Sequence, residues 1–267
     1  MTAVVYPLAD SATLFRRNLR RLRRYPSMTV LLIGMPIVFL LLFDGVFGGE
    51  LSHGLGSALS GGQVGRAAYL NYLTPGILLV MVAAAVQGTA IVVAMDMSGG
   101  LIDRFRIMAI ARSAVLTGHV LASLVQIVFS FGVVVAIAVA VGFRPSANAL
   151  AWFGAIGIIL LFAFALVWLA TALGLAAKSV ETASNTPMFL TLLPFLGSGF
   201  VRTATMPEGL RQFAEYQPFT PVTETLRGLL TGTGIGTNAV VAVAWSVGIA
   251  LISYLWARNR YEHHLPR

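Results

Sequence analysis

Two long uncharged blocks constrain the fold of this chain more than any other feature. Neither residues 114–141 nor residues 149–177 contain an Asp, Glu, Lys or Arg. A helix needs about 20 apolar residues to cross the hydrocarbon core of a bilayer, so each block is long enough to span it. Only 10% of all residues are charged, whereas a soluble domain usually carries about 25%. The sequence therefore predicts an all-α membrane protein.

Other apolar segments raise the expected number of spans to six. The six expected spans are 28–47, 72–95, 114–141, 149–177, 186–201 and 237–257. The fifth is short and contains Pro187 and Pro194. The sequence thus divides into an interface segment (1–27), a transmembrane domain (28–257) and a polar tail (258–267). Residues 48–68 are rich in Gly and Ser and are expected to form an external loop.

The segment before the first span predicts an amphipathic helix over residues 10–25. At 100° per residue Leu14, Phe15, Leu19 and Leu22 fall within about 140° of arc. The other side carries Arg16, Arg17, Arg20, Arg21, Arg23 and Arg24. Such a helix is expected to lie in the headgroup plane of the membrane. The alternative is a basic flank without a distinct helix.

The distribution of basic residues predicts the orientation. With six spans and a cytoplasmic N-terminus, 13 of the 18 basic residues lie inside and five outside. Arg and Lys prefer the cytoplasmic side, so both termini are expected in the cytoplasm. The same clustering beside apolar blocks argues against nucleic-acid binding, despite a net charge of +8.

The sequence offers no chemistry of its own. Lys178 is the only lysine, and Ala172 and Ala177 stand where a P-loop needs glycines. The chain has no cysteine, and its four histidines form no known metalloprotease motif. No catalytic residue, metal site or cofactor is therefore expected in this chain. Its spans also contain almost no acidic residue, which disfavours ion-coupled transport and favours an energy source outside the chain.

Two segments resemble one family of membrane proteins. Residues 95–126, MDMSGGLIDRFRIMAIARSAVLTGHVLASLVQ, are similar to the cytoplasmic loop and third span of ABC type-2 permeases. The matching residues are Asp96, Gly100, Asp103, Arg104 and Gly118, while Ala109–Ile110 stand where the family often has Pro-Ile or Pro-Val. Residues 187–232 resemble the fifth span and the external hairpin after it. The matching residues there are Met206, Pro207, Leu210, Pro218, Thr220, Glu224 and Arg227, with Gln217 in place of the usual Asn.

The resemblance covers nearly the whole chain and is greatest to the membrane subunits of daunorubicin/doxorubicin-resistance exporters of actinobacteria. It implies a multi-pass protein of the bacterial inner membrane. It also implies a second permease copy or a homologous permease as partner, and two copies of a separate subunit that binds ATP and Mg. The expected function is export of a hydrophobic or amphiphilic drug or lipid-like molecule. A polysaccharide or glycolipid exporter and an ion-coupled carrier remain alternatives.

The resemblance also suggests which residues act. We expect residues 101–111 to form a short helix that contacts the ATP-binding subunit, with Leu101, Phe105 and Met108 on one face. The full coupling set is Asp96, Leu101, Asp103, Arg104, Phe105, Arg106 and Met108. The alternative is a passive loop packed on the bilayer.

A second set is expected to line the cargo path, which in the resembling family follows the dimer axis beside spans 1, 2 and 5. Phe39, Phe43 and Phe47 share one face of the first span, and membrane lipid is the alternative neighbour of these rings. The full set is Phe39, Phe43, Phe47, Gln87, Phe195 and Phe200, with Phe189 nearby. Residues 207–232, with Pro207, Pro218, Glu224 and Arg227, are expected to form an external hairpin of short helices between spans 5 and 6. Charges at mid-bilayer would each cost roughly 2.5–3.5 kcal/mol.

Overall fold

The computed structural model describes residues 7–24, 26–47, 65–99 and 112–263 of the chain. Within these residues the secondary structure is helical, and they contain no strand. Five helical stretches are long and apolar enough to cross a membrane. The prediction of an all-α membrane protein is therefore confirmed.

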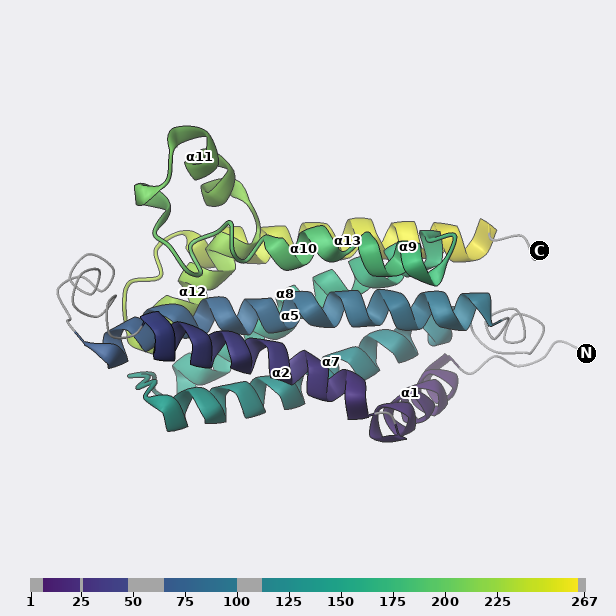
Figure 1. The fold of residues 1–267 in the computed structure, drawn as a ribbon. Coiled ribbons are helices and arrows are strands. Elements are labelled where there is room, and N and C mark those ends of the chain that lie inside the picture. Colours follow the sequence, from purple (N-terminus) through teal and green to yellow (C-terminus); the bar gives the residue numbers. More distant parts are fainter. Residues whose placement is uncertain (1–6, 25, 48–64, 100–111, 264–267) are drawn as a thin grey trace, which may run out of the picture.

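The five long helices lie side by side as a bundle (Figure 1). They are α2 (Pro26–Leu42), which continues into the π-helix η1 (Phe43–Phe47), α5 (Arg66–Ser98), α7 (Arg112–Val141), α8 (Ala149–Ala176) and α13 (Asn238–His263). The helices α5 and α8 form its core, where Leu73, Ile77 and Met81 of α5 and Ile159 and Phe162 of α8 are fully or almost fully buried. By contrast, α2, α7 and α13 expose apolar side chains over much of their length, as expected for surfaces that face lipid.

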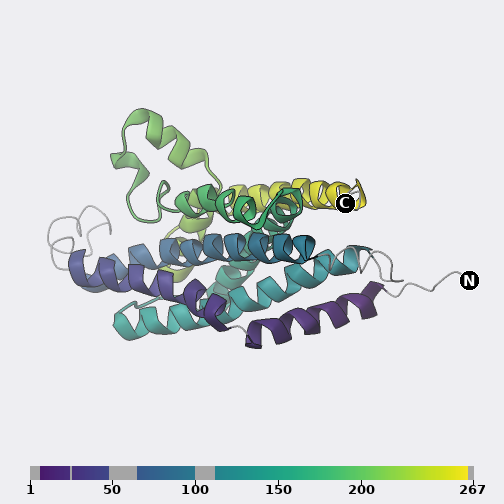
Figure 2. The ribbon, with the colours of Figure 1, turned by 45° about the vertical axis from the view of Figure 1, so that its right-hand side comes forward.

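The N-terminal helix α1 (Pro7–Arg24) lies beside the bundle and does not continue the line of α2. Figures 1 and 2 show α1 turned away from α2 and lying beside the start of α7. Pro26 begins α2 and cannot donate a backbone hydrogen bond back into α1, which accounts for the separation of the two helices. The end of α13 lies at the same end of the bundle as α1 (Figure 1).

The fifth expected span is not a continuous helix. Residues 180–201, here called the broken segment, comprise α9 (Val180–Asn185), α10 (Met188–Leu192) and a series of turns. Pro187 and Pro194 interrupt the helical hydrogen bonding because neither has an N–H group. Among the described residues there are consequently five candidate spans rather than six. The broken segment runs along α5 from the α1 end towards the opposite end of the bundle (Figure 1).

The expected hairpin at 207–232 has two different halves. The 3-10 turn η2 (Thr203–Thr205) and α11 (Glu208–Tyr216) stand off the bundle, as Figures 1 and 2 show. In contrast, α12 (Phe219–Thr231) returns to it and packs against α5, α8 and α13. The Phe219 ring meets Phe162 of α8 edge-on at 5.0 Å. The helix ends at Gly232, whose φ of 71° is left-handed and suits glycine.

Two helix boundaries, and with them the position of Pro75, differ from those expected from the sequence. The helix α5 begins at Arg66 rather than residue 72, so it includes the end of the expected external loop. Pro75 therefore lies in the interior of α5 rather than near its first turn. The helix α13 continues to His263, inside the expected tail. Polar residues such as Arg66 can extend a helix beyond its apolar part, and hydropathy does not register them.

Candidate functional site

Four phenylalanine rings gather where α2 and η1 meet the broken segment. The Phe39 ring lies 6.5 Å from Phe43 and 5.4 Å from Phe195, measured between centroids. Phe200 lies 5.2 Å from Phe43 and stacks on Phe195 at 4.7 Å with an interplanar angle of 13°. All four side chains are half-buried. This four-ring cluster brings together four of the six residues expected along the cargo path.

Side chains from neighbouring helices supply hydrogen bonds to the broken segment. Gln87 of α5 donates its side-chain amide to the Ser184 carbonyl at 3.0 Å. Gln217, which follows α11, donates to the Leu193 carbonyl at 3.0 Å. Both acceptors lie within three residues of a proline. The Leu193 carbonyl also accepts from the Leu196 N–H of the segment itself at 3.1 Å. The two glutamines therefore add hydrogen bonds from neighbouring elements close to the two prolines that interrupt the helix.

Arg227 of α12 joins three elements at the end of the bundle that carries α11. Its Nη2 donates to the Ser198 carbonyl at 2.8 Å and to the Tyr72 carbonyl at 3.2 Å, and its Nη1 pairs with Glu224. The guanidinium also lies 3.8 Å from the centre of the Tyr72 ring. The Tyr72 hydroxyl donates to the same Ser198 carbonyl at 3.0 Å. We call these four residues the Arg227 junction.

The backbones of α5 and the broken segment touch beside this junction. A Cβ atom placed on Gly76 would lie only 2.6 Å from the Gly199 carbonyl oxygen. Only a residue without a side chain fits there. Three buried polar atoms in the same region have no hydrogen-bond partner among the described residues: Ser198 Oγ, Gln217 Oε1 and Arg227 Nε. Buried polar atoms without a hydrogen-bond partner cost free energy. The backbones are therefore tightly packed here, while three nearby polar atoms lack hydrogen bonds among the described residues.

A second ion pair lies at the same end of the bundle. Arg66, in the first turn of α5, donates Nε to Asp44 of η1 at 2.7 Å and makes a second bond through Nη2. Bidentate pairs of this kind fix relative orientation as well as distance. Asp44 is buried while Arg66 is exposed. The pair fastens the π-helical end of α2 to the start of α5.

At the α1 end, Asp96 stands at the centre of an ion cluster. Arg21 of α1 donates Nη1 to Asp96 at 2.9 Å, and the Arg17 guanidinium lies 3.5 Å from the same carboxylate. His119 of α7 places Nε2 3.3 Å from Asp96 Oδ2. Asp96 and His119 are 7% and 4% exposed. These four residues, here called the Asp96 cluster, join α1, α5 and α7.

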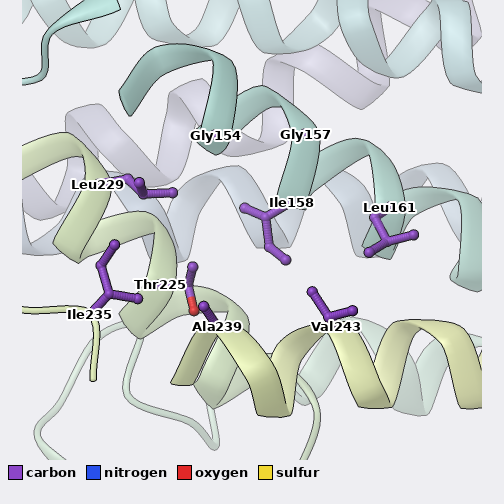
Figure 3. A pocket seen from close by; sticks show the side chains of 9 residues that line it. All are labelled: Gly154, Gly157, Ile158, Leu161, Thr225, Leu229, Ile235, Ala239 and Val243. Atoms are coloured by element: carbon purple, nitrogen blue, oxygen red, sulfur yellow. The ribbon is translucent and has the colours of Figure 1, made fainter. Parts of the chain in front are cut away.

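An apolar groove lies between α8, α12 and α13 (Figure 3). It is lined by Gly154, Gly157, Ile158, Leu161, Thr225, Leu229, Ile235, Ala239 and Val243. The single hydroxyl, that of Thr225, donates to the Pro221 carbonyl at 2.7 Å. The groove therefore offers hydrocarbon contact and no unpaired polar group from its lining.

The α11 half of the hairpin is exposed. Arg211 donates Nε to Glu215 at 2.8 Å one turn further on. This hydrogen bond, followed by the charge of Glu215, raises the pKa of Arg211 above its ordinary value. Leu210, Phe213 and Tyr216 expose apolar surface. Pro207 is exposed at the start of α11, whereas Pro218 lies at the start of α12.

Several expected site residues lie outside the description. Of the coupling set only Asp96 is described; Leu101, Asp103, Arg104, Phe105, Arg106 and Met108 lie in the segment 100–111, outside the described residues. The side chain of Phe47 is also outside the description. Phe189 is exposed and takes no part in the four-ring cluster. Within the described residues no group of three His, Cys, Asp or Glu side chains could hold a metal ion.

Sequence reasoning missed the partners of the charged residues. Tyr72 and Ser198 carry no signal of their own, because their roles arise from a contact between residues 126 apart in the sequence. His119 is one of the four histidines that belong to no recognised motif. An acid at the end of one span and a histidine early in the next could have suggested their pairing, since a buried charge requires a partner.

Two comparisons with known proteins give consistent results. A family model described as "ABC-2 type transporter" matches residues 11–231. The "Daunorubicin resistance ABC transporter permease protein DrrB1" of Streptomyces coeruleorubidus is 28% identical to this chain over 246 residues. The alignment covers 91% of this chain and 80% of that protein.

Proposed function

This chain belongs to the ABC-2 type transporter family, and from that premise we propose that it is the permease subunit of an exporter for hydrophobic or amphiphilic molecules. Membership implies a separate ATP-binding subunit and typically a dimeric permease. The chain is thus the transport component, and ATP with its Mg²⁺ belongs on the partner. An energy source in a partner subunit agrees with a sequence that lacks a P-loop. It also agrees with the position of the two acids of the candidate spans, Asp44 and Asp96, which lie near the ends of those spans and not at their centres.

The proposed topology has six crossings: the five long helices and the broken segment, which is fifth in order along the chain. Two observations support it: the broken segment follows α5 along the bundle, and α1 and the end of α13 lie at one end (Figure 1). An even number of crossings brings both termini to the same side. The arginine-rich α1 assigns that side to the cytoplasm, in the bacterial inner membrane. The Arg227 junction and α11 then belong to the outer side.

The cargo class rests chiefly on one observation, the similarity along 91% of the chain to a permease whose name assigns it to daunorubicin resistance. The four-ring cluster could bind such a molecule, because aromatic rings contact flat apolar molecules by stacking and by edge contacts. It lies between α2 and the broken segment, which correspond to two of the three spans that line the path in the resembling family. A polysaccharide would need polar groups along the path, and the cluster presents none.

Coupling to the ATP-binding subunit is assigned to the proposed cytoplasmic end. The residues proposed for it are Leu101, Asp103, Arg104, Phe105, Arg106 and Met108. They follow α5 directly in the sequence and precede α7. The end of α5 and the start of α7 lie at the α1 end of the bundle (Figure 1), which supports this assignment, since a partner in the cytoplasm can reach only that end of the protein.

The test is drug uptake into inside-out membrane vesicles that contain the chain together with its ATP-binding subunit. We expect ATP-dependent accumulation of daunorubicin, reduced by Phe195→Ala. The matched control is Phe153→Ala, which removes the same side chain from α8 where it is 75% exposed and should leave uptake unchanged. Absence of ATP-dependent uptake of daunorubicin and of other flat amphiphiles would refute the proposed cargo class. Equal loss in both variants would remove the four-ring cluster from the path.

A further inference from the structure

We propose that the Asp96 cluster is an ionic latch that holds α1 against the ends of α5 and α7, so that the three helices move as one unit throughout transport. The latch itself rests on the geometry of the four side chains. Its role in transport rests on the proposed function of the chain as an ATP-driven permease.

The cluster connects three helices through one carboxylate, that of Asp96 on α5. Two side chains of α1 lie close to it, Arg21 at 2.9 Å and Arg17 at 3.5 Å. His119 of α7 lies at 3.3 Å. Asp96 is the only acid in this group. Removing its charge therefore leaves two guanidinium groups and a buried histidine without the group that faces them all.

The helix α1 has three distinct faces. Leu14 and Asn18 are buried against the bundle, on the side from which Arg17 and Arg21 reach Asp96. Phe15, Leu19 and Leu22 form a half-buried apolar edge. Arg16, Arg20, Arg23 and Arg24 are exposed. The two arginines of the latch are thus separated from the four that face outward.

Apolar contact alone would not hold α1 in this position. Lipid tails are as apolar as Leu14, so the membrane supplies little hydrophobic force between two helices. The exposed arginines are attracted by anionic lipid headgroups, which lie away from the bundle. An ion cluster with fixed partners provides the specific attachment that neither of these forces gives.

The latch also connects the helices on either side of the segment proposed to contact the ATP-binding subunit. Asp96 lies before residues 100–111 and His119 lies after them. Their contact joins the end of α5 to the first part of α7, the two helices that flank that segment in the sequence. A force applied to the segment would consequently be passed to α1, α5 and α7 together, provided that the latch is closed.

The chain contains no cysteine, so an introduced pair of cysteines can replace the latch with a disulfide without competition from native thiols. A Cβ atom placed on Gly118 of α7 would lie 2.9 Å from Leu14 Cβ. A disulfide requires about 3.5–4.5 Å, which a small outward shift of α1 provides. The pair Leu14→Cys and Gly118→Cys can be oxidised to attach α1 to α7 covalently and reduced to release it.

Transport is measured in four preparations: the parent, Asp96→Asn, the oxidised cysteine pair, and the oxidised pair combined with Asp96→Asn. Asp96→Asn should lower drug uptake about tenfold or more, because it removes the one buried negative charge that Arg17, Arg21 and His119 share. The oxidised pair should transport like the parent. The combined variant should regain uptake when oxidised and lose it when reduced. Failure of the formed disulfide to restore uptake, or inhibition of the Asp96-containing protein by oxidation, would overturn the proposal.

A second measurement does not depend on transport. Spin labels at Arg23 of α1 and Leu121 of α7, both exposed, report the distance between the two helices in purified protein. The distribution should be narrow in the parent, broad in Asp96→Asn and unaltered in Asp96→Glu, which keeps the charge. An unchanged distribution in Asp96→Asn would refute the latch. If the parent shows no uptake at all, the proposed function fails while this measurement still decides on the latch.

Discussion

Replacing Gly76 with alanine should separate α5 from the broken segment. The added Cβ would lie 2.6 Å from the Gly199 oxygen and 2.8 Å from its carbonyl carbon and Cα. All three are backbone atoms, so no side-chain rotation can relieve the contact. Ordinary van der Waals contact begins near 3.4 Å, and the broken segment must therefore move by about 0.8 Å.

This displacement would break the Arg227 junction as well. The Ser198 carbonyl accepts bonds of 2.8 Å from Arg227 and 3.0 Å from Tyr72. If the shift lengthens both by 0.8 Å, they exceed the range of a hydrogen bond. Overpacking costs about 1–3 kcal/mol, and a hydrogen bond to a charged group contributes about 1.5–3 kcal/mol. The better helix propensity of alanine offsets about 1 kcal/mol, so the free energy of unfolding should fall by roughly 1.5–5 kcal/mol.

The assay is thermal unfolding of the purified protein in detergent, compared with Gly88→Ala. Gly88 lies in the same helix, and a Cβ added there meets no atom within 4 Å. The control should therefore unfold at the same temperature as the parent or slightly higher. Equal unfolding temperatures for Gly76→Ala and Gly88→Ala would show that α5 and the broken segment do not touch at Gly199.

Three further predictions follow from the same contacts. Arg227→Gln should lower the free energy of unfolding by about 3 kcal/mol, since it removes charged hydrogen bonds to the Ser198 and Tyr72 carbonyls, which contribute about 1.5–3 kcal/mol each; unaltered thermal unfolding would contradict this. Phe43→Ala and Gln87→Ala should each reduce drug resistance in cells at normal expression and basal ATPase activity. Full resistance in both would exclude these residues from the path. Cysteine at Glu215 should react with membrane-impermeant maleimide from outside the cell, and reaction only from the cytoplasmic side would reverse the topology.

Hydropathy and periodicity predicted those features that depend on one segment at a time. The uncharged runs at 114–141 and 149–177 correspond closely to α7 and α8. The spacing of Leu14, Phe15, Leu19 and Leu22 predicted a helix at the N-terminus, and α1 is present. An isolated segment reveals its own apolar face because side-chain directions in a helix follow from sequence spacing alone.

Contacts between distant segments could not be predicted in this way. The charges of Arg227 and Glu224 suggested an external hairpin, because charged groups are costly in lipid. In the structure, Arg227 finds partners in α5 and the broken segment and is largely buried. The cost of burying a charge depends on those partners, and a single sequence does not disclose them. The close approach of Gly76 and Gly199 is hidden for the same reason.

Neighbouring elements add hydrogen bonds to the broken segment, which we propose as a membrane crossing. Hydrocarbon offers no partner to a carbonyl released by Pro187 or Pro194. Gln87 serves the Ser184 carbonyl, Gln217 serves that of Leu193, and Tyr72 with Arg227 serves that of Ser198. The donors come from α5, from the residue that follows α11 and from α12, so the conformation of the broken segment is tied to the positions of α5 and α12. A movement of either helix therefore changes the hydrogen bonds of the segment that carries Phe195 and Phe200, two of the four rings in the proposed cargo path.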